Sequence, residues 1–251
     1  MTLRRPQPSR RNPPLLVALA LLPMLAGCSS RFGQPPSITE EGSHTLSLWR
    51  GFFIAACAVG GLVLGLILFA AVRFRRRSDE IPNQRPYNIP WEIAYTVTPV
   101  VVVAVLFGFS VSAQSKVDRT VAQPALTVEV VGFQWGWEFH YPDRNVTITG
   151  TSEAGEQPTL VLPVGATTRL VLKTDDVNHS FWVPSFLQKR DLIQGVDNAI
   201  DVTPTTVGSF DGKCAEFCGL DHWRMTFTLQ VVPADQLDSA ITAAAAKTGG
   251  G

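Results

Sequence analysis

The stretch GKCAEFCGLDHWRM, residues 212–225, holds five side chains that can bind a metal ion. They are Cys214, Glu216, Cys218, His222 and Met225. Thiolate, imidazole and thioether groups form a soft ligand set, and soft sets select copper, zinc or iron–sulfur clusters. The order Cys, His, Met is that of a copper site with a weak axial thioether, for which a second thiolate is superfluous. Two thiolates four residues apart can instead bridge two metal ions from one tight loop.

Two other interpretations of the cysteine pair remain open at this point. In an oxidising compartment the two cysteines could form a disulfide, and they could also supply half of a zinc site. Neither alternative explains the other ligands, because zinc has little use for a thioether and a disulfide needs neither His222 nor Met225.

Composition suggests a membrane-proximal half and a more acidic outer half. The chain has 251 residues, of which 45% are hydrophobic, and its mean hydropathy is +0.14. Its formal net charge is zero, but residues 1–115 carry about +6 and residues 116–251 about −6. Such a division favours an outer part that attracts basic partners.

Residues 1–27 are predicted to be a lipoprotein-type signal peptide that is removed. Four arginines precede a short apolar run at residues 15–25, which is too short to span a membrane. The run ends in Leu-Ala-Gly-Cys, similar to a bacterial lipobox, so we expect lipidation at Cys28. An ordinary signal peptide or an uncleaved anchor is the alternative. Residues 28–48 are predicted to be a linker.

Residues 49–115 are predicted to form a two-helix transmembrane hairpin. Residues 51–72 and 93–115 contain no charged side chain and are each long enough to span a bilayer. The link between them is rich in arginine, which places it in the cytoplasm and both chain ends outside. A pair of buried core helices is the alternative, but it would show more polar alternation. Glu92 lies at the cytoplasmic mouth of the second span.

Residues 116–251 are predicted to form an extracytoplasmic all-β domain. Short runs rich in valine, threonine and aromatic residues alternate with turn residues, which is typical of a β-sandwich or barrel. The expected strands are residues 126–131, 135–141, 146–149, 159–162, 167–174, 181–183, 198–202, 206–210 and 226–232. Residues 234–246 are expected to form a short helix, and the metal loop should join the last two strands without being a strand itself.

His179 is the best candidate for a further ligand outside the loop. It is expected in a polar turn just before an apolar strand, and only three other histidines are present. His44 precedes the first span and His140 lies in an expected strand, so His179 is the one that a sandwich can fold beside the cysteines.

Taken together, these motifs resemble one family, subunit II of the haem–copper cytochrome c oxidases. The resemblance covers the two spans, residues 134–137 (QWGW), 176–181 (DVNHSF), 184–186 (PSF), 189–191 (KRD) and the copper loop, residues 214–225. It implies a transmembrane hairpin followed by an all-β, cupredoxin-like Greek-key sandwich or barrel with a short C-terminal helix.

The resemblance also implies a ligand set for a binuclear copper centre called CuA. Cys214 and Cys218 would bridge the two coppers, and His179 and His222 would each bind one of them. Met225 and the carbonyl of Glu216 would be the weak ligands. The Glu216 carboxylate would in addition bind Mg²⁺ or Mn²⁺ at the boundary with subunit I.

Further positions match the family outside the copper loop. Trp135 resembles the tryptophan at which electrons arrive from cytochrome c, and this role is favoured over the alternative of a packed aromatic residue, which is expected for Trp137. Asp143, Asp175 and Asp176 are candidates for steering a basic cytochrome, and Asp176 also for supporting the copper site. Glu92 aligns with a glutamate at the cytoplasmic entrance of a proton pathway into subunit I.

The resemblance implies an electron-transfer subunit of a respiratory terminal oxidase in a bacterial plasma membrane. It would pass electrons from cytochrome c to haem a of subunit I, where oxygen is reduced to water and protons are pumped. Expected partners are subunits I and III, a soluble or tethered cytochrome c and membrane lipid, with no nucleic acid.

Three alternatives are weighed against this function. A membrane-tethered copper carrier would need an exposed site and neither Trp135 nor two spans. A quinol-oxidase subunit II would lack the copper ligands. Nitrous oxide reductase shares the copper motif, but no stretch here matches a propeller domain, and no Cys-x-x-Cys-His haem motif occurs.

Overall fold

In the computed structural model, the described residues are 31–76, 79–81, 84–151 and 157–248. The predictions of a signal peptide over residues 1–27 and of lipidation at Cys28 lie outside them. The chain divides into two compact units, Met1–Gln34 and Pro35–Gly251, and every described helix and strand belongs to the second unit.

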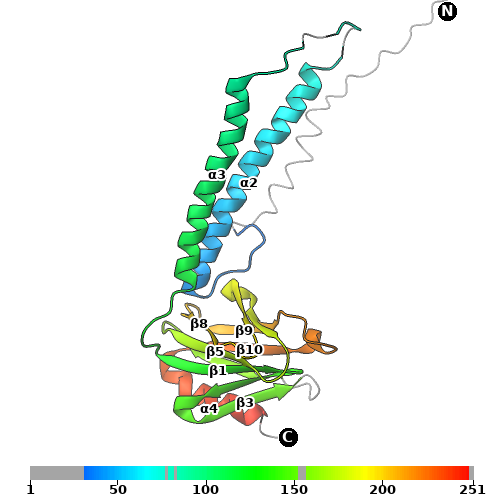
Figure 1. Ribbon diagram of the computed structural model, residues 1–251. Coiled ribbons are helices and arrows are strands. Elements are labelled where there is room, and N and C mark those ends of the chain that lie inside the picture. The colour runs from blue at the N-terminus through cyan, green and yellow to red at the C-terminus, as the bar shows by residue number, and fades with distance from the viewer. Residues whose placement is uncertain (1–30, 77–78, 82–83, 152–156, 249–251) are drawn as a thin grey trace, which may run out of the picture. The chain divides into compact units, whose positions relative to one another are not determined.

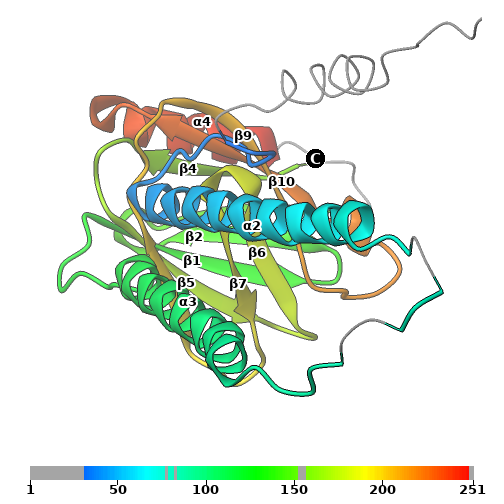
Figure 2. The same ribbon diagram turned by 90° about the horizontal axis from the view of Figure 1, so that it is seen from above.

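Two long helices, α2 (Glu40–Arg73) and α3 (Ile89–Val117), run side by side (Figures 1 and 2). Both are long and apolar enough to cross a membrane, and their apolar stretches are not buried by the protein. Each helix begins earlier than the predicted span. At α2 the Thr39 hydroxyl accepts the Gly42 N–H, and at α3 the Glu92 carboxylate accepts the Asn88 N–H. These caps satisfy backbone donors that the apolar pattern does not reveal, so part of the expected linker is helical.

The rest of the chain forms the predicted cupredoxin-like β-sandwich. One sheet has the strand order β3-β2-β1-β5-β8 and the other β4-β10-β9-β6-β7, and their inner faces bury one hydrophobic core. The strands are β1 (Leu126–Phe133), β2 (Gly136–Tyr141), β3 (Val146–Thr151), β4 (Thr159–Pro163), β5 (Thr168–Thr174), β6 (His179–Val183), β7 (Gln188–Leu192), β8 (Asn198–Val202), β9 (Gly208–Cys214) and β10 (Thr226–Val232). The predicted C-terminal helix is α4 (Leu237–Thr248), preceded by the 3₁₀ turn η4 (Ala234–Gln236).

Three local predictions were wrong. Strand β7 was not predicted, because its residues QKRDL are polar; it is an edge strand that pairs only with β6. Strand β9 extends to Cys214, inside the segment expected to be irregular, because it pairs with both β10 and β6. His179 is the first residue of β6 and is fully buried, not part of a polar turn.

A buried tyrosine joins the two sheets at the end of β2 that lies away from the metal loop. The Tyr141 hydroxyl, on β2, donates to the carbonyl of Val161 on β4 at 3.1 Å and accepts the N–H of the same residue at 2.8 Å. Burial raises the pKa of Tyr141 well above its usual range, so the hydroxyl stays protonated. The pair of hydrogen bonds holds the sheets in one fixed registration.

The helical hairpin is tied to the sandwich by polar contacts. The Arg169 guanidinium forms a two-pronged ion pair with the buried carboxylate of Asp201, with both N–O distances at 2.8 Å. Both side chains also bond the backbone of Val121, which lies in the segment that follows α3. A paired buried carboxylate of this kind fixes geometry, since breaking the pair would leave a charge without its partner.

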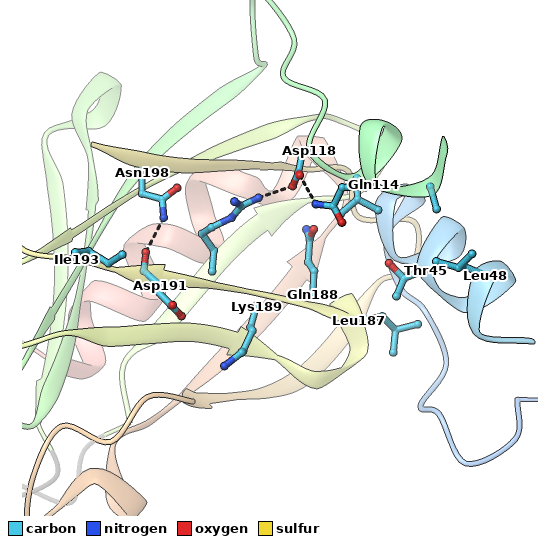
Figure 3. A pocket seen from close by; sticks show the side chains of 13 residues that line it. Thr45, Leu48, Gln114, Asp118, Leu187, Gln188, Lys189, Asp191, Ile193 and Asn198 are labelled. Atoms are coloured by element: carbon cyan, nitrogen blue, oxygen red, sulfur yellow. Dashed lines mark hydrogen bonds and ion pairs between the residues drawn. The ribbon is translucent and has the colours of Figure 1, made fainter. Parts of the chain in front are cut away.

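A polar cavity of about 500 Å³ lies where the sandwich ends of α2 and α3 face β7 (Figure 3). Several of its polar groups bond one another, while the buried Gln188 Nε2 and Arg190 Nε have no partner among the described residues. Arg190 donates to the Asp118 carboxylate at 2.5 Å, and Gln114 donates to the same carboxylate. Asn198 donates to the carbonyl of Asp191 at 2.8 Å.

Candidate metal centre

Two cysteine sulfurs form the centre of the site. Cys214 ends strand β9 and Cys218 lies in the loop after it, and their side chains are only 4% and 3% exposed. The two Sγ atoms are 4.0 Å apart and both thiols are free. The pair is therefore not a disulfide. Two metal–sulfur bonds of about 2.3 Å together exceed this separation, so a metal ion can bind both sulfurs at once.

A histidine lies beside each cysteine, with the same ring nitrogen directed at the sulfur. His179 Nδ1 is 3.8 Å from Cys214 Sγ, and His222 Nδ1 is 3.5 Å from Cys218 Sγ. The structure thus brings His179 from β6 to the loop, as the sequence suggested. His179, Cys214 and Cys218 offer ligand atoms that all lie within 4.8 Å of one another.

Two weaker donors complete the arrangement. Met225 Sδ lies 3.8 Å from Cys218 Sγ, and the carbonyl oxygen of Glu216 lies 3.2 Å from Cys214 Sγ. The Glu216 side chain itself is exposed, so its carboxylate is free to serve another purpose. Each sulfur thus has one imidazole and one weak donor near it.

Backbone and side-chain hydrogen bonds hold the loop in this form. The Cys214 N–H donates to the carbonyl of Met225 at 2.9 Å, and the Ala215 N–H donates to the carbonyl of Ser180 at 3.0 Å. From the core, the indole N–H of Trp137 donates to the same Met225 carbonyl at 3.3 Å. The ligands therefore sit on a loop fixed at both ends, which requires little rearrangement on metal binding.

Asp176 orients His179 from behind. Its Oδ1 accepts the His179 Nε2–H at 2.8 Å, and its Oδ2 accepts the Gln134 N–H at 2.7 Å. Burial raises the pKa of Asp176, but these hydrogen bonds outweigh burial and leave the pKa below its usual value. With Nε2 protonated, Nδ1 keeps its lone pair for a metal ion.

The two thiols have opposite pKa shifts. Burial raises the pKa of Cys214, but contacts with His179 and with the backbone of Glu216 and Ser180 outweigh burial and lower it below its usual value. For Cys218, burial and the adjacent Cys214 sulfur raise the pKa to about 12. Ionisation of Cys214 is therefore favoured, whereas ionisation of Cys218 as well is disfavoured unless a cation lies between the two sulfurs. The residues present fit a soft, multiply charged metal centre.

Trp135 contacts the site directly and is not a core residue. It lies in the turn before β2 and is partly exposed, and its indole N–H donates to the carbonyl of Cys218 at 3.2 Å. Gln134 donates to the same carbonyl at 2.7 Å, a contact that sequence reasoning missed. Gly219 makes room for both side chains, because a Cβ there would lie 3.0 Å from the Trp135 ring, and its φ of +124° also favours glycine.

The remaining predicted residues lie elsewhere. Asp175 is exposed beside Asp176 but its carboxylate makes no contact with the site among the described residues. Asp143 lies in the turn η1 (Pro142–Arg144), at the far end of β2 from Trp135 and so roughly 20 Å away. Glu92 lies at the start of α3, at the opposite end of that helix from the sandwich.

A patch of apolar side chains on the metal loop was not predicted. Phe217, Leu220 and Trp223 are 79%, 82% and 76% exposed. Apolar side chains gathered on one exposed loop are typical of an interaction surface. Their spacing gave no periodic signal, because the loop is neither helix nor strand.

Comparison with known proteins gives a consistent picture. Residues 126–232 match a model of the family described as cytochrome c oxidase subunit II, periplasmic domain. A protein of Streptomyces avermitilis named probable cytochrome c oxidase subunit 2 is 42% identical over 276 residues, covering 92% of this chain and 86% of that protein. Cytochrome c oxidase subunit 2 of Mycobacterium tuberculosis is 32% identical over 275 residues, covering 85% and 76%. The solved periplasmic domain of subunit II of cytochrome oxidase from Bradyrhizobium japonicum is 31% identical, covers 51% of this chain and 99% of that one, and has a TM-score of 0.46.

We predict that Asp176→Asn weakens copper binding by about 10- to 100-fold, because the amide no longer fixes the His179 ring through a charged acceptor. Asp175→Asn is the matched control, since it removes an adjacent carboxylate with no role in the site. Competition with a copper chelator measures both affinities. Equal losses in the two variants would show that general negative charge, not the contact to His179, matters.

Proposed function

The chain belongs to the cytochrome c oxidase subunit II family, and from this premise we propose that it accepts electrons from cytochrome c at a binuclear copper centre and passes them to haem a of subunit I. The oxidase complex would reduce oxygen to water there and pump protons. The observation that carries the proposal is the convergence of two sulfurs, two imidazole nitrogens, a thioether and a carbonyl in one closed site.

The site is built for electron transfer and not for substrate chemistry. When bound, the copper pair takes up one electron and releases it again. Cys214 and Cys218 would bridge the ions, His179 and His222 would bind one ion each, and the Met225 sulfur and Glu216 carbonyl would be weak ligands. The buried side chains and the fixed loop exclude water and hold the geometry, so little rearrangement accompanies the change of charge.

Trp135 is proposed as the point at which electrons enter. It is partly exposed, and its indole N–H is bonded to the backbone of a bridging cysteine. No other tryptophan is bonded to the backbone of a proposed bridging cysteine within the described residues. Trp137, by contrast, is fully buried in the core and serves the packing of the loop.

A second cation is proposed on the outer side of the loop. The Glu216 side chain is exposed, whereas the carbonyl of the same residue lies against Cys214. A hard cation such as Mg²⁺ or Mn²⁺ prefers oxygen ligands, so this carboxylate suits it and the sulfur site does not. The remaining ligands would come from subunit I.

The protein is a membrane protein with an extracytoplasmic C-terminal domain. Beyond this we propose that α2 and α3 both cross the bacterial plasma membrane, that residues 1–27 are a signal peptide and that Cys28 carries lipid. The domain boundaries given from the sequence, 28–48, 49–115 and 116–251, belong to the same proposal. Glu92 is proposed at the cytoplasmic entrance of a proton pathway, and subunit III as a further partner.

A membrane-tethered copper carrier is the less favoured function. A carrier needs ligands that a partner can reach in order to exchange its ion. Here His179, Cys214, Cys218 and Met225 are all at most 4% exposed, and His222 is the one proposed side-chain ligand that is partly exposed. That degree of burial favours a resident centre.

Copper-loaded protein should give a paramagnetic resonance spectrum with hyperfine splitting from two equivalent copper nuclei. Cys218→Ser should abolish this pattern, because it removes one of the two bridging sulfurs. Cys57→Ser, on α2, is the control and should leave the spectrum unchanged. Splitting from a single nucleus in the unmodified protein would contradict the binuclear assignment.

Trp135→Phe should slow oxidation of reduced cytochrome c by the complex and leave the copper spectrum intact. The substitution keeps an aromatic ring but removes the N–H bonded to Cys218. Trp182→Phe is the control, since Trp182 stacks on Lys213 and makes no bond to the loop cysteines. Stopped-flow kinetics measures both, and an unchanged rate in Trp135→Phe would remove this residue as the point of electron arrival.

We propose that the patch of Phe217, Leu220 and Trp223 packs against subunit I, because permanent interfaces are more apolar than transient ones. Leu220→Glu should therefore lower the amount of subunit I that co-purifies with the tagged chain. Val207→Glu, at a valine that is 53% exposed outside the loop, is the control. Equal recovery of subunit I with both variants would argue against this assignment.

A further inference from the structure

A groove lies between α2 and α3 near their sandwich ends. It encloses about 360 Å³ and is lined largely by apolar atoms, with Gly51 and Phe52 on one helix and Leu106, Phe109 and Ala113 on the other. These positions recur at helical spacing on the facing sides of the two helices. The groove therefore lies within the part of the hairpin that the membrane would surround.

A polar cavity of about 390 Å³ continues from the groove toward the sandwich. His44 and Lys116 line both cavities. The polar one is also lined by Arg119 and by the acidic residues Glu40, Glu41 and Asp201, of which Asp201 is paired with Arg169. The apolar groove and the charged chamber therefore share two lining residues, and the chamber lies on the sandwich side of the groove, where the headgroups of a bilayer are expected.

Two cations of this chamber, Lys116 and Arg119, have no ion-pair partner among the described residues. In the neighbouring cavity of Figure 3, Arg190 is paired with Asp118, and on the sandwich Arg169 is paired with Asp201. Lys116 and Arg119 form no comparable pair within those residues. The chamber also holds the carboxylates of Glu40 and Glu41, so its charges of both signs are complementary to a zwitterionic headgroup attached to an apolar chain.

We propose that a phospholipid occupies this site, with an acyl chain in the groove and its phosphate at Lys116 and Arg119. The Glu40 carboxylate in the same chamber favours a headgroup that also carries an ammonium group, as in phosphatidylethanolamine. The inference rests on the proposed function only in requiring that the hairpin stands in a membrane. The lipid would fill the groove at the junction and brace the hairpin where the sandwich is attached.

The test uses the full chain in vesicles that contain phosphatidylethanolamine with a photoactivatable acyl chain. Mass spectrometry of the labelled peptides should place most of the cross-links in residues 44–52 and 106–116. Joint Lys116→Glu and Arg119→Glu substitution should reduce labelling on the order of tenfold, since each cation near a headgroup contributes severalfold. Gly51→Leu should reduce it as well, because the new side chain fills the groove.

Matched controls separate this site from ordinary surrounding lipid. Gly60→Leu adds the same side chain to α2, at another glycine with open space around it that does not line the groove, and should leave labelling unchanged. Arg85→Glu reverses a charge in the link between the helices and should also have no effect. Labelling spread evenly along both helices, or equal loss in Gly51→Leu and Gly60→Leu, would overturn the proposal.

The copper spectrum of the same samples keeps the two proposals distinct. A variant that retains the two-copper spectrum is correctly folded, so a lack of selective labelling then counts against the lipid site alone. Selective labelling in protein with a single-copper spectrum would count against the electron-transfer assignment and leave the lipid site standing.

Discussion

The hydrogen bond from the Cys214 N–H to the Met225 carbonyl is the constraint on which the metal site depends. The bond makes Cys214 and Met225, the first and last ligands of the loop, neighbours across the β9–β10 ladder. The loop between them is therefore closed at its base. Cys218 and His222 lie within this closed loop, with Cys218 Sγ near Cys214 Sγ and His222 Nδ1 near Cys218 Sγ. Trp137 donates to that carbonyl from the opposite sheet and couples the loop to the core of the sandwich. A loop closed in this way is positioned by the strands that carry it.

Rigidity matters here because the ligands oppose one another electrostatically. The two sulfurs are 4.0 Å apart in a buried setting, and each disfavours ionisation of the other. A flexible loop would relieve this by moving the thiols apart. The backbone bonds at Cys214 and Ala215 prevent such movement, so the site keeps a shape that only a bound cation neutralises.

The sequence predicted the chemistry of the site better than its surroundings. Cys214, Cys218, His222 and Met225 lie within one loop, so their spacing alone brings them together. The strands at residues 198–202 and 226–232 were predicted with the observed limits, because each has a clear apolar pattern between turn residues. Strand β7 was missed since a polar edge strand resembles a loop, and the buried position of His179 was missed since it depends on pairing with β7. The contacts of Gln134 and Asp176 join segments more than forty residues apart in the chain and have no local signal.

The same contacts decide how the acidic residues near the site can act. Both oxygens of Asp176 are engaged, one by His179 and Val177 and the other by Gln134. A carboxylate satisfied in this way gains little by pairing with a cation on a docking protein, because it would first have to give up its internal bonds. The neighbouring Asp175 is exposed, and its carboxylate makes no such hydrogen bonds among the described residues. The negative charge of the outer half is therefore divided between anions that build the site and anions free to attract a partner, a division that net charge cannot reveal.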